Sequence, residues 1–233
     1  IACGPLGGTS IYPGSGKSIV VTISPLTDSV MDSNVGGYFG SYLKFAGWDA
    51  LEIQGKAKSE VVIFIDGDEG KVMIENAEEL PSETHLLAEI LTEKYGGGNK
   101  RSISLVSAGP GAEHTRFGCL NSSWYDLTRK IVRYKQAGRG GTGTVLRNKK
   151  VKAIVVKFSN LTAEANNPAD SDLLSQIGPA YNKEIRTLDP KQHEMAVLGT
   201  THLVDIMNDF DLLPTNNFKF GSHPKALNLG QEV

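Results

Sequence analysis

Cysteine is scarce in this sequence, and long apolar runs and a one-sided charge are absent. Its two cysteines, Cys3 and Cys119, fit neither a disulfide framework nor a Cys-x2-Cys metal motif. No stretch approaches the roughly 20 apolar residues that span a bilayer, and no secretion signal opens the chain. Lysine and arginine total 24 against 26 aspartate and glutamate residues, so no overall field attracts nucleic acid or anionic lipid. We therefore expect a cytoplasmic protein with no nucleic-acid or membrane partner.

The remaining composition is that of a globular protein. With 39% hydrophobic and 21% charged residues, the 233-residue chain can bury a sizeable core. Buried, reduced thiols are the favoured interpretation of the two cysteines, and the five histidines have no motif partner. The chain opens at Ile1 inside a Gly/Pro-containing stretch without an initiator methionine, so we expect its front to be truncated.

Short β-branched runs predict strands in the first two thirds of the chain. In the last of them Val151, Ala153 and Val155 alternate with Lys152 and a final Lys157. One helix is predicted at 82–95, with Ser82 as its cap and three glycines as its stop. The predicted strands are 18–24, 61–66, 71–75, 102–107 and 151–158, the second and third joined as a hairpin.

The composition of the sequence changes after Phe158. Residues 159–170 are rich in Asn, Ala, Asp and Thr, and helical periodicity follows at 173–185, interrupted at Gly178-Pro179, and at 195–207. We therefore predict a first domain at 1–161 that mixes α and β structure. Residues 162–233 would begin a second, mainly helical domain that continues elsewhere.

Twenty-six glycines form the strongest remaining signal, with clusters at 4–16, 36–40 and 138–143. Clustered glycine indicates backbone that turns sharply or approaches a ligand closely. For any one of these loops, a tight turn between strands and a ligand-binding role explain the glycines equally well.

Two glycine motifs imitate nucleotide-binding loops. Residues 14–18 (GSGKS) end like a P-loop, but Ile11 replaces the leading glycine and a strand follows where a helix is required. Residues 138–143 (GRGGTG) satisfy the Gly-x-Gly-x-x-Gly pattern, but we expect no room for the receiving helix before the strand at 151. We reject both nucleotide readings.

The second loop is also basic. Lys130, Arg133, Lys135 and Arg139 surround its glycines, and arginine with exposed amides suits an anionic ligand. A solvated, charged turn explains the same composition equally well.

Three stretches together resemble the amino-terminal domain of the tungsten-containing aldehyde ferredoxin oxidoreductase family. Their order and spacing match over most of 1–158, and the match is looser beyond Leu161. The stretches are 2–6 (ACGPL), 24–50 with SNVGGYFG and LKFAGWDA, and 137–143 (AGRGGTG).

The resemblance implies an α+β fold in which two packed β-sheets with flanking helices form the base for a flat pterin cofactor. Carried over position by position, it implies cofactor contacts at Asn34, Gly36, Gly138 and Arg139. It also departs from the family pattern, because lysine replaces arginine at Lys17 and Lys135, and Gln136 stands where a small residue is usual. These three are retained as cofactor-binding candidates, with lysine acting as a point charge rather than a fork. The stretch 121–134 is longer than its family equivalent, and we expect its Trp124 and Tyr125 to reshape the pocket mouth.

The family activity implied is oxidation of aldehydes to carboxylic acids at a tungsten (or molybdenum) bis-pterin centre. Electrons would pass through a [4Fe-4S] cluster to ferredoxin or another electron carrier. The cysteine ligands of that cluster are absent from this chain, so remaining domains or a complementary chain are implied, with a homodimer as a further option. Two alternatives stay open: part of the catalytic subunit of a tungsten aromatic acyl-CoA reductase, and a non-catalytic cofactor-binding remnant.

Overall fold

A computed structural model describes residues 1–162, 165–187 and 195–230. The chain divides into two compact units, Ile1–Ile177 and Gly178–Val233. The first contains every strand named below, and the described part of the second contains helices and turns. The domain boundary near Leu161 stays a prediction.

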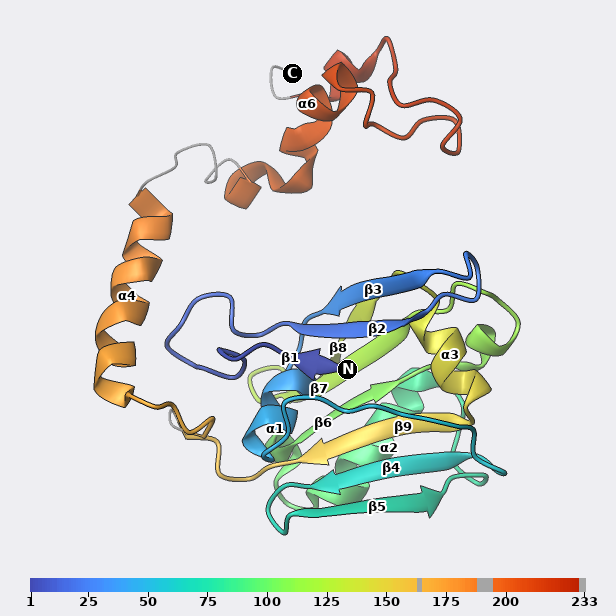
Figure 1. The fold of residues 1–233 in the computed structure, drawn as a ribbon, viewed down its shortest axis with the longest axis vertical. Coiled ribbons are helices and arrows are strands. Elements are labelled where there is room, and N and C mark those ends of the chain that lie inside the picture. The colour runs from blue at the N-terminus through green and yellow to red at the C-terminus, as the bar shows by residue number, and fades with distance from the viewer. Residues whose placement is uncertain (163–164, 188–194, 231–233) are drawn as a thin grey trace. The chain divides into compact units, whose positions relative to one another are not determined.

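A six-stranded sheet forms the centre of the first unit (Figure 1). Every neighbouring pair is antiparallel except β4 and β9, which run parallel. The predicted hairpin is confirmed as β4 and β5. In spatial order the strands are β5 (Lys71–Asn76), β4 (Val61–Asp66), β9 (Val151–Lys157), β6 (Ile103–Ser107), β7 (Leu120–Asp126) and β8 (Ile131–Ala137).

Both faces of this sheet are buried, because successive residues of each central strand enter opposite cores. Ile63 and Ile65 of β4 join one apolar cluster, whereas Val62 and Phe64 join the other. The same alternation in β9 buries all residues from 151 to 156. The strand predicted at 151–158 is confirmed as β9, and within it even Lys152 is only 2% exposed.

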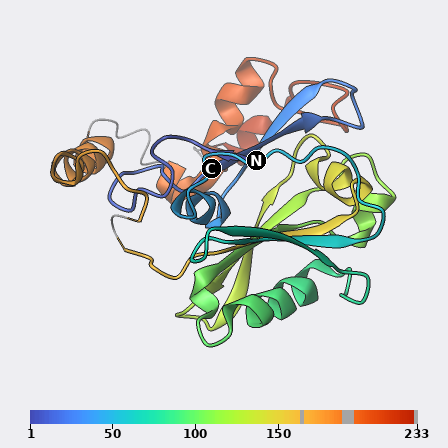
Figure 2. The same cartoon turned by 60° about the horizontal axis from the view of Figure 1, so that its bottom comes forward.

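Different elements cover the two faces (Figures 1 and 2). Helix α2 (Thr84–Gly96) packs on one face. The other face carries α1 (Phe39–Phe45), α3 (Thr142–Asn148) and a small antiparallel sheet. That sheet has the order β1 (Ala2–Cys3), β2 (Ser18–Ile23) and β3 (Val30–Val35). The predicted α+β fold with two sheets and flanking helices is confirmed.

The helix cap differs from the prediction. Glu83, not Ser82, caps α2, because its carboxylate accepts hydrogen bonds from the backbone N–H groups of His85 and Leu86 at 3.0 and 2.7 Å. These two bonds, followed by the contact with the His85 ring, lower the pKa of Glu83 to about 2.

Helical structure follows β9 in the chain. The helix α4 (Ser171–Thr187) runs through Pro179 without a break, so the interruption predicted at Gly178-Pro179 is wrong. Proline removes the bond to the carbonyl of Ser175, which lies on an exposed turn where water can replace it. At 195–207 helical structure is present, as residues 195–198, a 3-10 turn (Gly199–Leu203) and α6 (Val204–Asp209). Further 3-10 turns lie at Lys100–Ser102, Pro110–Glu113 and Ala226–Leu229.

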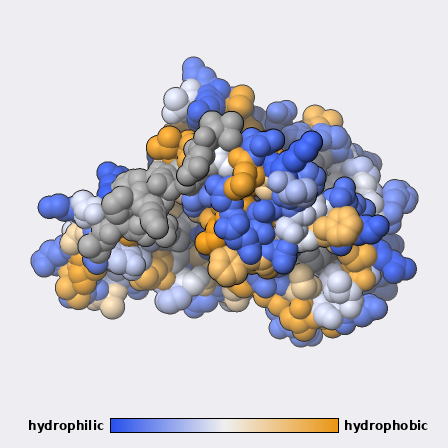
Figure 3. Space-filling model, turned by 90° about the horizontal axis from the view of Figure 1, so that it is seen from above, coloured by the Kyte–Doolittle hydropathy of each residue, from blue (hydrophilic) through white to orange (hydrophobic). Residues whose placement is uncertain are grey.

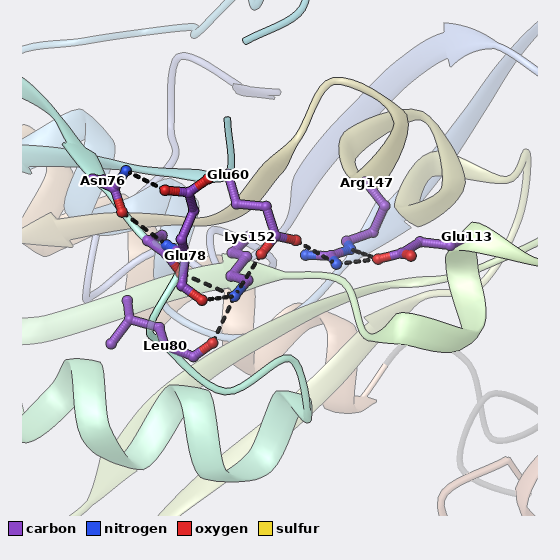
Figure 4. Close-up of polar contacts among 8 residues, drawn as sticks. Glu60, Asn76, Glu78, Leu80, Glu113, Arg147 and Lys152 are labelled. Carbon is purple, nitrogen blue, oxygen red and sulfur yellow. Dashed lines mark hydrogen bonds and ion pairs between the residues drawn. The ribbon is translucent and has the colours of Figure 1, made fainter. Parts of the chain in front are cut away.

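A buried ion-pair network ties the large sheet to α3 (Figure 4). The Glu60 carboxylate lies 2.7 Å from Lys152 Nζ and 2.8 Å from Arg147 Nη2. Lys152 also donates to the carbonyls of Ala77 and Leu80, at 2.9 and 2.6 Å, and Arg147 pairs with Glu113 as well. Each buried cation is thus compensated, as burial of charge requires.

Apolar side chains also remain exposed. On β2, Ile19, Val21 and Ile23 are 37%, 54% and 64% exposed, while Val20 between them is buried. The face in Figure 3 carries hydrophobic side chains among hydrophilic ones. A row of this kind is typical of a surface that contacts another protein segment.

Candidate functional site

Two glycine-containing loops lie where β3 of the small sheet borders β8 of the large one. The first joins β3 to α1, and the second joins β8 to α3. The backbone N–H of Arg139 donates to Ser33 Oγ at 3.1 Å, and a Cβ on Gly140 would lie 3.0 Å from Met31 Cβ. Segments about 100 residues apart in sequence thus form one surface.

The first loop brings two lysines together at Gly36. In the antiparallel β2–β3 pairing Ser18 lies opposite Val35. The next position outward therefore places Lys17 opposite Gly36. A Cβ placed on Gly36 would lie 3.8 Å from Lys17 Nζ and 3.5 Å from Lys135 Cγ. These three positions are candidates for one site from the sequence, and the fold makes them neighbours.

We call Lys17, Lys135 and Arg139 the cation cluster. All three are exposed, and none forms an ion pair with a carboxylate in the part of the chain that the structure describes. The Lys17 carbonyl accepts a hydrogen bond from Cys3 Sγ at 3.6 Å. Exposed cations without carboxylate partners leave this surface open to anions.

The remaining candidates differ in their surroundings. Asn34 is exposed between buried Ser33 and Val35, and within the described residues its side chain forms no hydrogen bond with the cation cluster. Gly138 is exposed, and a Cβ there would meet no atom within 4 Å. Its backbone is therefore open to a ligand.

Gln136 lies on the opposite face of the large sheet from Lys135. Its Nε2 donates to Asn121 Oδ1 at 3.3 Å, and its same-face neighbours Val132 and Tyr134 belong to the α2 side. Strand alternation separates adjacent residues in this way. The structure thus does not bring Gln136 to the cation cluster.

Two residues of this surface were missed from the sequence. Ser33 holds the second loop through its bond to Arg139. Gly37 has φ +96°, and a Cβ there would lie 2.8 Å from Ser122 Oγ, so only glycine fits. The Gly36-Gly37 pair in the sequence could have indicated the role of Gly37. Nothing in the sequence distinguishes Ser33 from other serines.

A helix does follow the second loop, contrary to the expectation that no room exists for one. Helix α3 begins directly after Gly141, whose φ of +66° reverses the chain within one residue. The dinucleotide reading still fails, because β8 is an antiparallel edge strand rather than the first strand of a parallel βαβ unit. The P-loop reading fails as predicted, since Ser18–Ile23 is a strand.

Cys3 behaves as a structural thiol. Burial, the largest influence, raises its pKa, while the charge of Lys44 and the backbone of Gly4 act in the opposite direction. Cys119 is half-buried, and both cysteines are free. Within the described ranges no group of three or more His, Cys, Asp and Glu residues could hold a metal ion.

The sequence model of the aldehyde ferredoxin oxidoreductase N-terminal domain matches residues 1–158. The chain belongs to this family. The resemblance noted from the glycine loops is thereby confirmed.

Relatives of aldehyde ferredoxin oxidoreductase type match nearly the whole chain. The tungsten-containing aldehyde ferredoxin oxidoreductase of Pyrococcus horikoshii is 36% identical over 225 residues, covering 94% of this chain and 33% of the relative. That of Pyrococcus furiosus is 34% identical, covering 97% and 34%. An aliphatic sulfonate oxidoreductase, WOR-like subunit, of Pyrococcus furiosus is 32% identical over 68% of the chain. The chain therefore spans about a third of the length of these aldehyde oxidoreductases.

A solved structure shares the fold of this aldehyde ferredoxin oxidoreductase domain. It is the active site complex BamBC of benzoyl coenzyme A reductase with 1,5-dienoyl-CoA. The TM-score is 0.57 at 29% identity, covering 68% of this chain and 22% of the other.

No helix among the described residues is long and apolar enough to cross a membrane.

Proposed function

We propose that this chain is the cofactor-holding part of a cytoplasmic oxidoreductase that oxidises aldehydes to carboxylic acids. The cofactor would be a tungsten (or molybdenum) bis-pterin. The observation that carries the proposal is the convergence of Lys17 and Lys135 on Gly36, beside the second loop with Arg139. The family membership and the names of the relatives support it.

The chain's residues fit an anionic, flat cofactor. Lys17 and Lys135 supply positive charge with no carboxylate to compete for it in the described part of the chain. Arg139 adds a planar fork that can hold two phosphate oxygens, and the open backbone at Gly138 permits close approach. When bound, the cofactor supplies the two-electron redox chemistry. The role of these residues is to hold and orient it and to neutralise its charge.

Further protein segments complete the proposed enzyme. The chain spans about a third of the relatives, and the [4Fe-4S] cluster and ferredoxin, or another electron carrier, would be engaged through segments outside it. The exposed apolar row Ile19, Val21 and Ile23 offers a surface for such a segment, for a complementary chain or for a second copy.

A second candidate is the corresponding part of a tungsten aromatic acyl-CoA reductase. The 29% identity and TM-score of 0.57 to the benzoyl coenzyme A reductase complex favour it. Both candidates use the same cation cluster, but they differ in the substrate and in whether that substrate is oxidised or reduced.

Metal and pterin analysis of the protein purified from its native host tests the shared part of the proposal. We expect tungsten or molybdenum together with pterin, measured by elemental mass spectrometry and by fluorescence of the oxidised pterin. In a recombinant host that makes the cofactor, the pair Lys17→Gln and Lys135→Gln should lower pterin content at least about tenfold, because two charge-assisted contacts are lost.

The matched control is Lys58→Gln, which removes an exposed lysine with no side-chain contact in the described structure. It should leave pterin content unchanged. A folded native protein without metal or pterin would refute the proposal and favour a non-catalytic remnant. Aldehyde oxidation assayed against aryl-CoA reduction then separates the two candidates.

A further inference from the structure

A cavity of about 900 Å³ opens beside the cation cluster. We call it the hairpin cavity, because its walls are the loop 8–16, helix α1 and the turn end of the β7–β8 hairpin. It adjoins the cation cluster through chain neighbours, since Gly16 precedes Lys17 and Gly37 follows Gly36. Its volume is near the upper end of small-molecule sites, which span about 300 to 1,000 Å³.

One wall of the hairpin cavity is aromatic. The Tyr38 and Trp124 ring centroids lie 5.3 Å apart, and Tyr38 and Tyr42 lie 5.9 Å apart. Trp124 is 9% exposed, whereas Tyr38 is 45% exposed, so the outer ring of the group remains available. An exposed aromatic ring backed by buried ones suits stacking of a planar ligand.

The charged residues of the lining leave an excess of positive charge. They are Arg101, Arg129 and Arg133 against Asp126. Asp126 already accepts from Arg129 at 3.0 Å and lies 3.5 Å from Arg133, whose guanidinium stands over the Trp124 ring at 5.8 Å. The cavity is therefore cationic beside its aromatic wall.

Arg101 is the cation that remains available. Its carbonyl accepts from Tyr42 Oη at 2.7 Å, which fixes the backbone against α1. Its guanidinium has no hydrogen-bond or ion-pair partner among the residues that the structure covers. A free guanidinium presents a planar fork that matches a carboxylate.

We propose that the hairpin cavity binds an aromatic carboxylate, with its ring on the Tyr38 wall and its carboxylate on Arg101. The volume accommodates two fused rings. The anion is recognised at Arg101 rather than at the cation cluster, so this site can be tested on the cofactor-free chain. Its failure would leave the proposed cofactor role untouched.

Isothermal titration of the chain with 2-naphthoate tests the proposal. We expect saturable one-to-one binding, weakened about tenfold or more by Arg101→Gln through loss of the charge-assisted bond. Arg101→Lys should be intermediate, because it keeps the charge and loses the fork. Neutral 2-naphthamide should bind the original chain and the Arg101→Gln variant equally.

The matched control is Arg116→Gln, an exposed arginine outside the cavity lining, which should bind as the original chain does. Tyr38→Leu should weaken both the acid and the amide, because it removes the stacking surface. Absence of saturable binding overturns the proposal. An equal loss of affinity in Arg101→Gln and Arg116→Gln also overturns it. An equal loss of affinity in Arg101→Gln and Lys135→Gln would place the carboxylate on the cation cluster and would overturn it as well.

Discussion

Replacing Glu60 by glutamine should destabilise the first unit strongly. The carboxylate stands between two cations whose side chains are 2% and 3% exposed, Lys152 and Arg147. Glutamine has nearly the same shape, but it removes the charge and turns an amide group toward one of the cations. Breaking a buried ion pair by removing one partner costs about 3 to 5 kcal/mol, because the remaining charge stays buried and uncompensated.

The structure favours the lower end of that range. Lys152 keeps its bonds to the Ala77 and Leu80 carbonyls, Arg147 keeps Glu113, and the Glu60 side chain is 30% exposed. We therefore expect a loss of about 3 kcal/mol in the free energy of unfolding. For a unit of this size, that lowers the melting midpoint by roughly 6 to 12 °C.

Tryptophan fluorescence during guanidinium unfolding measures this loss. Both tryptophans, Trp48 and Trp124, lie in the first unit, so the signal reports that unit alone. The control Glu79→Gln makes the same charge change at an exposed site and should stay within about 0.5 kcal/mol of the original chain. If Glu60→Gln and Glu79→Gln unfolded at the same denaturant concentration, the reasoning would be refuted.

The same network predicts a pH dependence. Burial raises the pKa of Glu60, but the bonds and charges of Lys152 and Arg147 outweigh it and leave that pKa below its ordinary value. A lowered pKa in the folded state means that the stabilisation is complete above the ordinary carboxyl pKa and is lost as pH falls through the folded value. The gap between the original chain and Glu60→Gln should therefore close below about pH 4.

Three further outcomes follow from other parts of the first unit. Gly37→Ala should lower the free energy of unfolding by about 1 to 3 kcal/mol, because its φ is +96° and the new Cβ would meet Ser122, as guanidinium unfolding would measure. Glu83→Gln should lower the melting temperature at pH 7, with the difference shrinking as pH falls from about 4.5 toward the folded pKa of about 2; a constant difference across that range would exclude capping by the carboxylate. A disulfide reagent should modify half-buried Cys119 before buried Cys3, and in Cys119→Ser the modification rate should follow unfolding rather than thiol ionisation at neutral pH.

The strands that could be predicted are those with runs of β-branched and other apolar residues, whether they lie inside the large sheet or at its edge, as β5 does. β4 and β9 lie inside the large sheet, and burial on both faces gives β4 a continuous apolar run and β9 an apolar run interrupted by Lys152. In contrast, β7 contains Ser122 and Ser123, which are fully buried although they are polar. Their strand is fixed by pairing with both neighbours, which a single sequence does not display. Helices α1 and α3 have seven residues each, too few to establish a periodicity.

The candidate site was predictable to the extent that its residues flank glycines. The positions of Lys17, Gly36 and Lys135 came from the resemblance, but their contact depends on the β2–β3 register and on β8 bordering β3. Gln136 shows the limit of such transfer. Without knowledge that β8 is a strand, nothing indicates that it faces away from Lys135.

The position of β9 has a consequence for the order in which the chain assembles during synthesis. It is the last strand of the large sheet to leave the ribosome, yet it lies between β4 and β6, and Val151 pairs with Val61. Until it arrives, the β4–β5 hairpin and the β6–β7–β8 meander are separate pieces with apolar, unpaired edges, which are prone to misassociation. Long-range pairing of this kind is also slow. The large sheet therefore closes only after Lys17, Gly36 and Lys135 have all been synthesised, because Val151 follows them in the chain.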